Sequence, residues 1–421
     1  MNILWITNNC IGYARECLGI KNASGTWLEA ALSSFSARTD ISLSIAFTSS
    51  VKERIEFNND SVFYYCLPRR NKKAYQYNSS KCKEDWRWVI SNSKPDLFMI
   101  WGTEYTHGLC AMQVAPHIPS VIVIQGIIDS VYRFYLGGLS FKELLTAYSL
   151  RNFLKKDSIL ATRKLYYKRL LTEKEMLCQA KNVIVENEWS QALCKNINRE
   201  CRFFEYRQTV NTVFWENKWD ASNCHKRTIF CSSPVNYPLK GFHQMIKALS
   251  VIKKECLDVQ LRVPGMDNPF HCSFFQKFKQ NGYIKYIKSL IVNLDLADNI
   301  VFLGKLNSAQ ISEELLHANV FVVPSCIENL SISLREAMVV GTPSVSSFVG
   351  GLPETIQDRE NGRLYRFEDF FHLAEIIMSI FNDEKQALKY SENARKTMRS
   401  YLSIKSDPNT LISIYKEILS Q

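Results

Sequence analysis

The chain has 421 residues, of which 46% are hydrophobic and 22% are charged, a balance typical of soluble globular proteins. This length exceeds one ordinary hydrophobic core, so we predict two domains. The formal net charge of +11 excludes an acidic chain and favours partners that carry phosphate.

The N-terminus and the cysteines bear on location. The stretch "MNILWIT" has no basic region and no small-residue cleavage site, so we interpret it as a first strand and not as a signal peptide. No apolar run reaches about 18 residues, so no membrane-spanning helix is expected. The 13 cysteines are odd in number, and none forms a C-x-x-C pair. This pattern argues against a disulfide framework and a zinc site, and it favours a reducing cytoplasm.

The first half of the chain alternates short β-rich runs with helical stretches. These strands are continuous apolar runs, which is typical of a parallel sheet that is covered on both faces. A helix is expected at 27–35, after Gly25. The predicted strands are "NILWIT" (2–7), "LSIAFT" (43–48), "LFMIW" (97–101), "SVIVIQG" (120–126) and "NVIVEN" (182–187).

From 132 to about 180 the pattern becomes helical and rich in Tyr, Phe, Lys and Arg. The window 133–169 holds nine Lys or Arg residues against two acids, Glu143 and Asp157. Apolar residues recur there at helical spacing, so an apolar stripe edged by cations is plausible. We interpret the segment as a surface for an anionic or lipid-linked acceptor, or for the inner face of a membrane. The alternative is that the stripe packs on the core of the N-terminal domain.

The second half repeats the βα alternation. Its predicted strands are 228–234, 259–265, 300–304, 320–325 and 342–347, and its predicted helices are 241–255, 283–294, 308–318 and 331–341. The segment 200–226 lacks strong periodicity and is the predicted linker. We therefore expect domains at 1–205 and 206–395, and a C-terminal helix in 396–421 that packs back on the first domain. Ligands of such folds bind at the carboxyl ends of the parallel strands.

"PSCIENLSISLREAMVVGTP" (324–343) holds two glutamates, Glu328 and Glu336, where a strand gives way to a helix. Eight helical residues rise about 12 Å, too far for the carboxyl pair of a glycoside hydrolase or for a shared metal. Between the two glutamates lie the free amides of a helix N-terminus, at Leu330–Ser333, which favour a phosphate or diphosphate. Carboxylate, anion site and carboxylate in that order match sugar, diphosphate and ribose, the parts of a nucleotide sugar.

The residues 324–356 resemble the E-x7-E segment of the family 4 retaining glycosyltransferases. "PLKGFHQMIKAL" (238–249) is similar to the Lys-Gly turn and following helix of that family, and "RENGRLY" (359–365) also falls where the family has it. The likeness is specific over 228–365 and weak over 1–200. It implies the GT-B fold, in which two Rossmann-like α/β domains face a central cleft. It also implies bacterial polysaccharide biosynthesis as the setting.

The resemblance implies roles for individual residues. Glu328 would hold hydroxyls of the transferred sugar, Glu336 would hold the ribose, and Lys240 would neutralise the donor diphosphate. Glu328 and Lys240 would therefore be the catalytic residues. Further donor-binding residues would be Leu330, Ser331, Ile332, Ser232, Ser233, Gly25 and Arg207. Acceptor-side residues would be Glu104, His107 and Gln125, which follow two strands of the first domain.

Three positions depart from the family pattern. Val235 stands where a second diphosphate-binding Arg is frequent, and Trp101 and Gln125 stand where the family often has a His. Ser232, Ser233 or Arg207 would then replace the missing cation. No D-x-D motif stands at a strand end, and no G-x-G-x-x-G or P-loop motif is present, so neither a metal nor a dinucleotide cofactor is expected.

The resemblance therefore predicts a metal-independent retaining glycosyltransferase of the hexosyltransferase type, cytoplasmic and peripheral on the inner face of the membrane. It would move a sugar from a nucleotide diphosphate sugar to a saccharide or lipid-linked acceptor. Three alternatives stay open. They are a nucleotide-sugar epimerase of the same fold, a sugar transferase that acts on DNA, and a catalytically silent binding subunit. Nucleic acid is not the expected partner.

Overall fold

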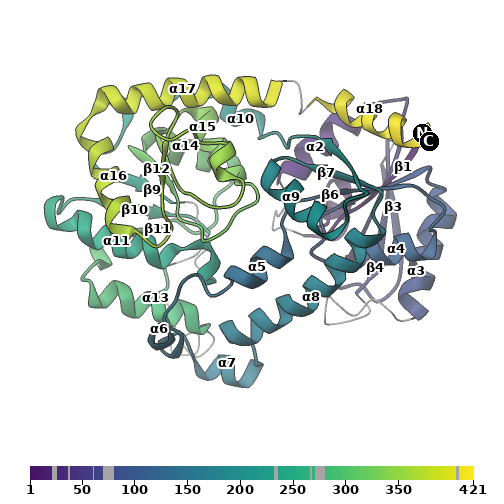
Figure 1. Cartoon of the computed structure of the whole chain (residues 1–421), viewed down its shortest axis with the longest axis horizontal. Helices are drawn as coiled ribbons and strands as arrows, with labels where there is room; N and C mark the ends of the chain where they lie inside the picture. The colour runs from purple at the N-terminus through teal and green to yellow at the C-terminus, as the bar shows by residue number, and fades with distance from the viewer. Residues whose placement is uncertain are drawn as a thin grey trace. The chain divides into compact units, whose positions relative to one another are not determined.

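In a computed structural model of the chain, the described residues are 1–20, 26–36, 38–59, 61–69, 80–231, 236–265, 268–270, 280–403 and 407–421. They form two compact units, and the chain passes between them more than once (Figure 1). Unit 1 consists of Met1–Asp129, Tyr166–Thr209 and Leu402–Gln421. Unit 2 consists of Ser130–Leu165 and Val210–Tyr401.

Unit 1 is built on one sheet. Within the described ranges its strand order is β3-β4-β2-β1-β5-β6-β7-β8, and every neighbouring pair is parallel except β3 with β4. The strands are β1 (Asn2–Ile6), β2 (Ser42–Ser49), β3 (Ile55–Asn59), β4 (Val62–Pro68), β5 (Leu97–Trp101), β6 (Ser120–Val123), β7 (Asn182–Val185) and β8 (Arg202–Glu205). The helices are α1 (Tyr13–Cys17), α2 (Thr26–Ser36), α3 (Ser80–Ser93), α4 (His107–Val114), α9 (Glu188–Ile197) and α18 (Pro408–Leu419), and α5 (Ile128–Phe134) and α8 (Ile159–Gln179) continue into unit 2.

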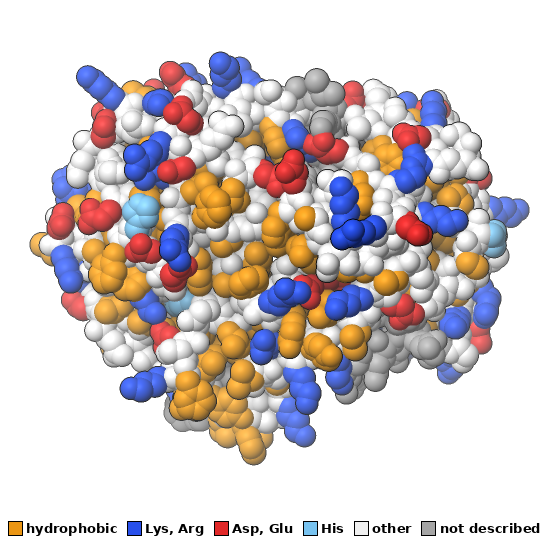
Figure 2. All heavy atoms as spheres, viewed as in Figure 1, with side chains coloured by type: hydrophobic (Ala, Val, Ile, Leu, Met, Phe, Trp, Pro, Cys, Tyr) orange, Lys and Arg blue, Asp and Glu red, His pale blue; other side chains and the backbone are white. Residues whose placement is uncertain are grey.

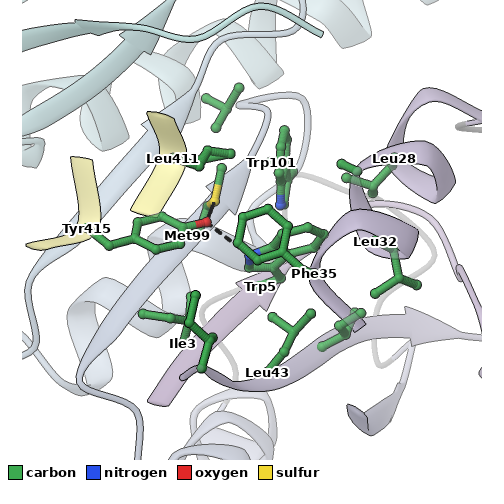
Figure 3. Packing of buried hydrophobic residues seen from close by; sticks show 14 of the residues in the cluster. Ile3, Trp5, Leu28, Leu32, Phe35, Leu43, Met99, Trp101, Leu411 and Tyr415 are labelled. Carbon is green, nitrogen blue, oxygen red and sulfur yellow. Dashed lines mark hydrogen bonds between the residues drawn. The ribbon is translucent and has the colours of Figure 1, made fainter. Parts of the chain in front are cut away.

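The sheet of unit 1 is buried on both faces, as its apolar strands predict. Neighbouring residues of β1 point to opposite sides: Trp5 belongs to one hydrophobic cluster and Leu4 to another. In the first cluster, the rings of Trp5 and Trp101 meet edge to face at 5.2 Å (Figure 3). Tyr415 of α18 joins the same cluster, where its hydroxyl accepts a hydrogen bond from the Trp5 indole at 3.2 Å. Trp101 is therefore a core residue.

Unit 2 has its own parallel sheet. Within the described ranges its strand order is β11-β10-β9-β12-β13-β14. The strands are β9 (Thr228–Phe230), β10 (Gln260–Val263), β11 (Ile300–Phe302), β12 (Val320–Val323), β13 (Ser344–Ser347) and β14 (Arg363–Tyr365). The helices are α6 (Phe141–Thr146), α7 (Leu150–Lys155), α10 (Thr212–Glu216), α11 (Phe242–Glu255), α13 (Gly282–Asn293), α14 (Ser308–His317), α15 (Ile332–Val340), α16 (Phe370–Asn382) and α17 (Glu384–Ser403), and the single turns are η1 (Ala221–Asn223), η2 (Pro238–Lys240), η3 (Ala297–Asn299) and η4 (Leu352–Glu354).

The segment 130–165 differs from the prediction, which placed it in the N-terminal domain. It belongs to unit 2, and it is divided into short helices instead of forming one continuous helical segment. Gly137 and Gly138 both have positive φ and form the turn that separates α5 from α6. A Cβ at Gly137 would lie 2.5 Å from the Pro238 carbonyl oxygen, so the turn packs directly on unit 2.

The side chain of His243 holds the turn at Gly137 and Gly138 in place. It is fully buried on α11, with Nε2 2.9 Å from the Gly137 carbonyl oxygen and Nδ1 2.9 Å from the Tyr283 hydroxyl. Burial lowers the pKa of His243 to about 4, and nearby Lys247 adds to that effect. The ring is therefore neutral, and it donates to the carbonyl while it accepts from the tyrosine.

The predicted linker 200–226 also contains regular structure. Residues 202–205 form β8, which is the last strand of the unit 1 sheet, and 212–216 form α10. All four residues of β8 are half-buried, because the strand has a neighbour on one side only. An edge strand of this kind has neither an apolar run nor a clean alternation, which is why periodicity did not reveal it.

Candidate active site

Two loops of unit 2 meet at the carboxyl ends of β9 and β12. The backbone amide of Cys326 donates to the Leu239 carbonyl oxygen at 2.8 Å, which joins the loop after β12 to the turn before α11. Gly241 has a φ of 67°, and a Cβ there would lie 1.7 Å from the Pro324 carbonyl oxygen. Only glycine permits this approach, so the Lys-Gly turn seen in the sequence is a requirement of the packing.

The two predicted catalytic residues, Lys240 and Glu328, lie side by side in unit 2. The Lys240 ammonium forms an ion pair with Oε1 of Glu328, and the Ser325 hydroxyl donates to the same oxygen at 2.8 Å. The side chains are 24% and 11% exposed, so the pair is largely shielded from water. A second glycine holds the Glu328 backbone: Gly350 has a φ of 54°, and a Cβ there would meet the Glu328 carbonyl oxygen at 1.8 Å.

The electrostatics of the pair keep Lys240 charged. Burial by itself lowers the pKa of Lys240, but the negative charge of Glu328 opposes this effect, and the pKa ends above its ordinary value. Burial raises the pKa of Tyr237, which is therefore a neutral hydroxyl at pH 7. The site thus presents one buried cation that is balanced by one carboxylate.

The N-terminus of α15 follows Glu328 directly. Ser331 is its N-cap and accepts from the Leu334 amide at 3.2 Å. The amides of Ile332 and Ser333 make no hydrogen bond with the described part of the chain. Their N–H groups and the helix dipole therefore favour an anion beside Leu330–Ser333, as the sequence predicts.

Glu336 lies in the second turn of α15. It is 9% exposed, and its carboxyl makes no hydrogen bond or ion pair with any described residue. Burial raises the pKa of Glu336 to about 8. A buried carboxyl without a partner is costly for the folded chain, which is typical of a group that a ligand is meant to satisfy.

In unit 1, three loops at the carboxyl ends of neighbouring strands bring polar groups together. Glu104 follows β5, and its Oε2 accepts from the Asn8 side chain, which follows β1, at 2.9 Å. Gly126, which follows β6, lies next to the same carboxyl: a Cβ there would be 3.4 Å from Oε1 of Glu104. Burial, together with the charge of Glu173, raises the pKa of Glu104 to about 7.

Glu173 supports these loops from α8. It accepts from the Thr103 hydroxyl at 2.6 Å and from the amides of Ile128 and Asp129 at 3.0 and 3.1 Å. Burial raises its pKa to about 7 as well. Its carboxyl fixes the loop after β5 and the start of α5, so it positions the surroundings of Glu104.

His107 and Gln125 lie in the same part of unit 1. His107 begins α4, and its Nε2 lies 3.2 Å from the Thr48 hydroxyl. Its ring stacks on Tyr105 at 5.6 Å, and its Nδ1 has no hydrogen-bond partner in the described ranges. Burial lowers its pKa to about 4, so the ring is neutral. Gln125 directly precedes Gly126 and is half-buried.

The family of the C-terminal half follows from its sequence. Residues 213–397 match the family model described as Glycosyl transferases group 1. This segment belongs to the group 1 glycosyl transferases. The match includes Lys240, Glu328, Glu336 and the N-terminus of α15, and it confirms the resemblance inferred from 228–365.

Two curated relatives each match less than half of this chain. N-acetyl-alpha-D-glucosaminyl L-malate synthase of Bacillus anthracis is 26% identical over 181 residues, 43% of this chain and 43% of the relative. MMP alpha-(1->4)-mannosyltransferase of Mycolicibacterium hassiacum is 24% identical over 197 residues, 47% of this chain and 44% of the relative. The chain thus spans less than half the length of these curated relatives.

Solved structures resemble the whole chain. Sucrose-phosphate synthase from Thermosynechococcus elongatus matches with a TM-score of 0.74 and 17% identity over 99% of both chains. Anabaena HepE in complex with UDP and glucose matches with a TM-score of 0.67 and 16% identity over 100% of both chains. The glycosyltransferase WaaG matches with a TM-score of 0.64 and 14% identity. These likenesses confirm the predicted α/β architecture and the GT-B fold.

Four of the predicted donor-binding residues stay predictions. Gly25, Ser232 and Ser233 lie outside the described residues. Arg207 belongs to unit 1, where its guanidinium forms an ion pair with Glu205 at 2.6 Å. Whether Arg207 contacts a donor stays a prediction.

Sequence reasoning did not identify four residues that lie near Lys240 and Glu328 in unit 2 or near Glu104 in unit 1. Ser325 and Tyr237 both lie within three residues of a predicted catalytic residue, and that short distance was the signal available for them. Asn8 had a signal as well, because it comes just after the first strand. Glu173 had none: it lies inside a long helix and reaches Glu104's loop only through the packing of α8.

The first loop of unit 1 lines a pocket of about 430 Å³. Glu29 of α2 also lines it, and its carboxylate accepts from the Gly12 amide at 3.0 Å and forms an ion pair with Arg15 at 3.0 Å. Sequence reasoning pointed to this loop only through Gly25. The lining of this pocket in unit 1 includes a cation, Arg15.

The described ranges hold no group of three or more His, Cys, Asp or Glu side chains that is suited to a metal ion. Within the same ranges, no helix has the length and the apolar character that crossing a membrane requires. Twelve cysteines of the described residues are free thiols.

Proposed function

We propose that this protein is a retaining glycosyltransferase that transfers a sugar from a nucleotide diphosphate sugar to a saccharide or lipid-linked acceptor. The observation that carries the proposal is the ion pair of Lys240 with Glu328, followed along the chain by the amides at the start of α15 that make no hydrogen bond with the described residues. Its relatives support it, since they include a mannosyltransferase and an N-acetylglucosaminyl-malate synthase. HepE, which was solved with UDP and glucose, supports a nucleotide sugar as the donor.

In this proposal, the diphosphate binds at the amides of Ile332 and Ser333 and attracts Lys240 away from Glu328. The carboxylate of Glu328 is then available to accept hydrogen bonds from hydroxyls of the transferred sugar. Glu336, which has no partner among the described residues, accepts from the ribose hydroxyls. Glu328 therefore exchanges its contact with Lys240 for hydroxyls of the donor sugar. Glu336 gains a hydrogen-bond partner that the described residues do not provide.

The resemblance to the family 4 retaining glycosyltransferases implies the proposed chemical step. The acceptor oxygen forms a bond to the anomeric carbon on the face from which the phosphate leaves, while the bond from that carbon to the phosphate oxygen breaks. The acceptor proton passes to the departing phosphate oxygen. Lys240 and the helix amides stabilise the charge that develops on the leaving group, so they act mainly in the transition state. The configuration at the anomeric carbon is retained.

The acceptor is assigned to unit 1 in this proposal. Glu104, His107 and Gln125 lie at the carboxyl ends of its strands, where ligands of α/β sheets bind. Glu104 has a pKa of about 7, and His107 is neutral, so together they offer acceptors and donors for sugar hydroxyls without a strong fixed charge. This chemistry suits a saccharide better than it suits a polyanion such as DNA.

A donor screen with the purified protein tests the proposal. UDP-, GDP- and ADP-sugars are each incubated with candidate saccharide acceptors, and the released nucleotide diphosphate is measured. We expect release from one donor class, a product of unchanged anomeric configuration, and the same rate with and without EDTA, because Lys240 and the helix dipole carry out the role of a metal.

The same screen separates the alternatives. Conversion of the donor without any acceptor indicates an epimerase, and dependence on duplex DNA indicates a DNA sugar transferase. Nucleotide binding without turnover of any donor would leave a binding subunit as the answer. A rate that disappears with EDTA and returns with Mn²⁺ contradicts the metal-independent mechanism.

A further inference from the structure

Two short helices of unit 2 expose their apolar side chains. On α6, Phe141 is 74% exposed and Leu145 is 61% exposed. On α7, Leu150, Phe153 and Leu154 are 60%, 65% and 70% exposed. Figure 2 shows hydrophobic side chains gathered over α6 and α7 with Lys and Arg side chains beside them. We call these five side chains the apolar patch. Its residues are neighbours on each helix because they are spaced three or four positions apart.

The helices that carry the apolar patch are held by their polar sides. On α7 the one buried residue is Asn152, which is 3% exposed and accepts from the Gly282 amide at 2.7 Å. On α6, Glu143 accepts from Lys247 at 2.9 Å and from Tyr286 at 2.7 Å. Capping boxes at Ser140 and Ser149 fix the start of each helix. The amphipathic pattern is therefore reversed, with polar side chains inward and apolar side chains outward.

This arrangement decides between the two interpretations of the segment that the sequence left open. The stripe does not pack on the core of the N-terminal domain, because its large residues are exposed and its helices belong to unit 2. Because these polar contacts and capping boxes fix α6 and α7, the exposure of their apolar side chains is a property of the folded unit. A contiguous exposed apolar surface that is built in this way marks an interaction site.

The charges around the apolar patch are positive. Lys142, Lys155, Lys156 and Lys164 are exposed and form no ion pair with the described residues. The two acids of the region are both neutralised, since Glu143 pairs with Lys247 at 2.9 Å and Asp157 pairs with Arg151 at 2.9 Å. The surface therefore combines exposed apolar side chains with uncompensated positive charge.

We propose that the apolar patch and its four lysines dock on an anionic phospholipid bilayer. Phe and Leu side chains would enter the boundary between headgroups and acyl chains, while the lysine ammonium groups stay at the headgroups on their flexible stems. Lysine is depleted at protein–protein interfaces, where a cation loses its water, but it is favoured at an anionic membrane surface. The bilayer is thus a better fit than a second protein.

Vesicle flotation tests this docking without any enzyme substrate. The full-length protein is mixed with vesicles of phosphatidylcholine alone or of phosphatidylcholine with phosphatidylglycerol, and the bound fraction is measured. We expect binding to the vesicles that contain phosphatidylglycerol, with a loss of affinity at high salt. Leu150→Ser, Phe153→Ser and Leu154→Ser combined should lower the partition coefficient at least about tenfold. Lys142→Glu with Lys155→Glu should lower it about fivefold or more for each lysine.

A matched control variant changes the same residue types elsewhere in unit 2. Lys254→Glu with Leu257→Ser alters an exposed lysine and a leucine that is 76% exposed on or beside α11, far in sequence from the apolar patch. Its partition coefficient should equal that of the wild type. Lys156 is left unchanged because its left-handed backbone, with a φ of 54°, would add strain to any comparison. Thermal unfolding of each variant checks that the fold is intact.

The outcome is independent of the proposed function, because neither vesicle binding nor its loss requires sugar transfer. Nucleotide release from a soluble donor should be the same in all these variants. Equal binding of the wild type to both kinds of vesicle, or equal binding of wild type and patch variants, would overturn the proposal. Loss of a dimer in the triple serine variant, without any vesicle binding by the wild type, would identify the patch as a protein interface instead.

Discussion

The Lys240–Glu328 pair shows how one charge sets the state of another at a buried site. Glu328 raises the pKa of Lys240 against the opposing effect of burial, so the lysine is kept as a cation before any substrate binds. Glu336, eight positions along the chain, has no such partner among the described residues, and burial alone raises its pKa to about 8. The two glutamates of one motif therefore lie in different electrostatic surroundings.

Replacing Lys240 should separate catalysis from stability. Lys240→Met removes the charge and keeps most of the side-chain volume, and we expect kcat to fall about 10²- to 10³-fold with a smaller change in the donor KM. It also leaves the largely buried Glu328 without its cation, which should destabilise the fold. Adding Glu328→Gln should restore stability but not kcat. If only KM rises in the single variant, Lys240 has no special role in the transition state.

Removing the carboxyl of Glu336 should weaken nucleotide binding. Glu336→Ala is expected to reduce the affinity for the nucleotide diphosphate by about 1–3 kcal/mol, because a charge-assisted hydrogen bond to the ribose is lost. Isothermal titration calorimetry measures this change directly. Far-UV circular dichroism should show the same fold in both proteins. Unchanged affinity would remove Glu336 from the binding site.

Glu336 should also make nucleotide binding depend on pH. Its pKa of about 8 means that the free protein holds a proton there at neutral pH, whereas ribose hydroxyls favour the ionised form. Binding then releases a proton, so affinity should rise as pH increases from about 6 to about 8 and become constant above that range, by at most about tenfold per pH unit. Glu336→Gln cannot ionise and serves as the control, since the nucleotide titrates identically with both proteins. Parallel pH profiles would contradict the assignment.

At the scale of elements, the carboxylate of Glu143 joins α6 to α11 and α13 through Lys247 and Tyr286. Burial opposes the charge of Glu143, but hydrogen bonds from Tyr286 and Lys247 outweigh that effect and lower the pKa of Glu143 to about 2. A carboxyl whose pKa is lowered on folding contributes stability above its unfolded pKa, and that contribution is lost as pH falls toward the folded pKa. The attachment of α6 should therefore weaken in acid.

Glu143→Gln should reduce the free energy of unfolding by about 1–2 kcal/mol at pH 7, because two charge-assisted or strong hydrogen bonds are weakened at a partly exposed site. Urea unfolding at several pH values measures the difference. It should narrow as pH falls from about 4.5 toward about 2, where the wild-type carboxyl also becomes protonated. A difference that stays constant over this range would show that the charge of Glu143 does not stabilise α6.

At the scale of the whole molecule, the chain completes unit 1 only with its last residues. After unit 2 it returns as α18, which buries Leu411, Ile412 and Tyr415 in the same cluster as Trp5. The Tyr415 hydroxyl also contacts the Met99 sulfur (Figure 3). The stability of unit 1 therefore depends on residues that lie about 400 positions away from its first strand.

Truncation of the chain before Asp407 should destabilise unit 1 selectively. Removing α18 exposes a buried face that includes Trp5, and each large apolar side chain lost from the core costs about 2–5 kcal/mol. We expect protease-sensitive unit 1 and a protected unit 2 in limited proteolysis followed by mass spectrometry. A truncated protein whose unit 1 resists protease as the full chain does would show that α18 is dispensable.

The sequence by itself determined the class of the fold, and it predicted the donor half of the site. Continuous apolar strands such as "NILWIT" and "FVVPS" can be stable only when a sheet is covered on both faces, so local pattern and tertiary structure agree there. Glu328 and Glu336 were singled out by their place where a strand gives way to a helix, and Lys240 by the family resemblance, and the roles of all three stay predictions. A Cβ at Gly241 or at Gly350 would clash with a backbone carbonyl oxygen, so the motif requires glycine at both positions.

Only the tertiary structure decided the place of 130–165 and the partners of its side chains. A helix periodicity states which residues share a face, but it does not state whether that face points inward or outward. On α7 the buried residue is Asn152, because its side-chain oxygen accepts a hydrogen bond from the Gly282 amide. The leucines of the same helix remain exposed. Glu173 near Glu104 and Tyr415 near Trp5 likewise come together through packing between distant segments. Contacts of that kind depend on the path of the whole chain, which no short window of sequence contains.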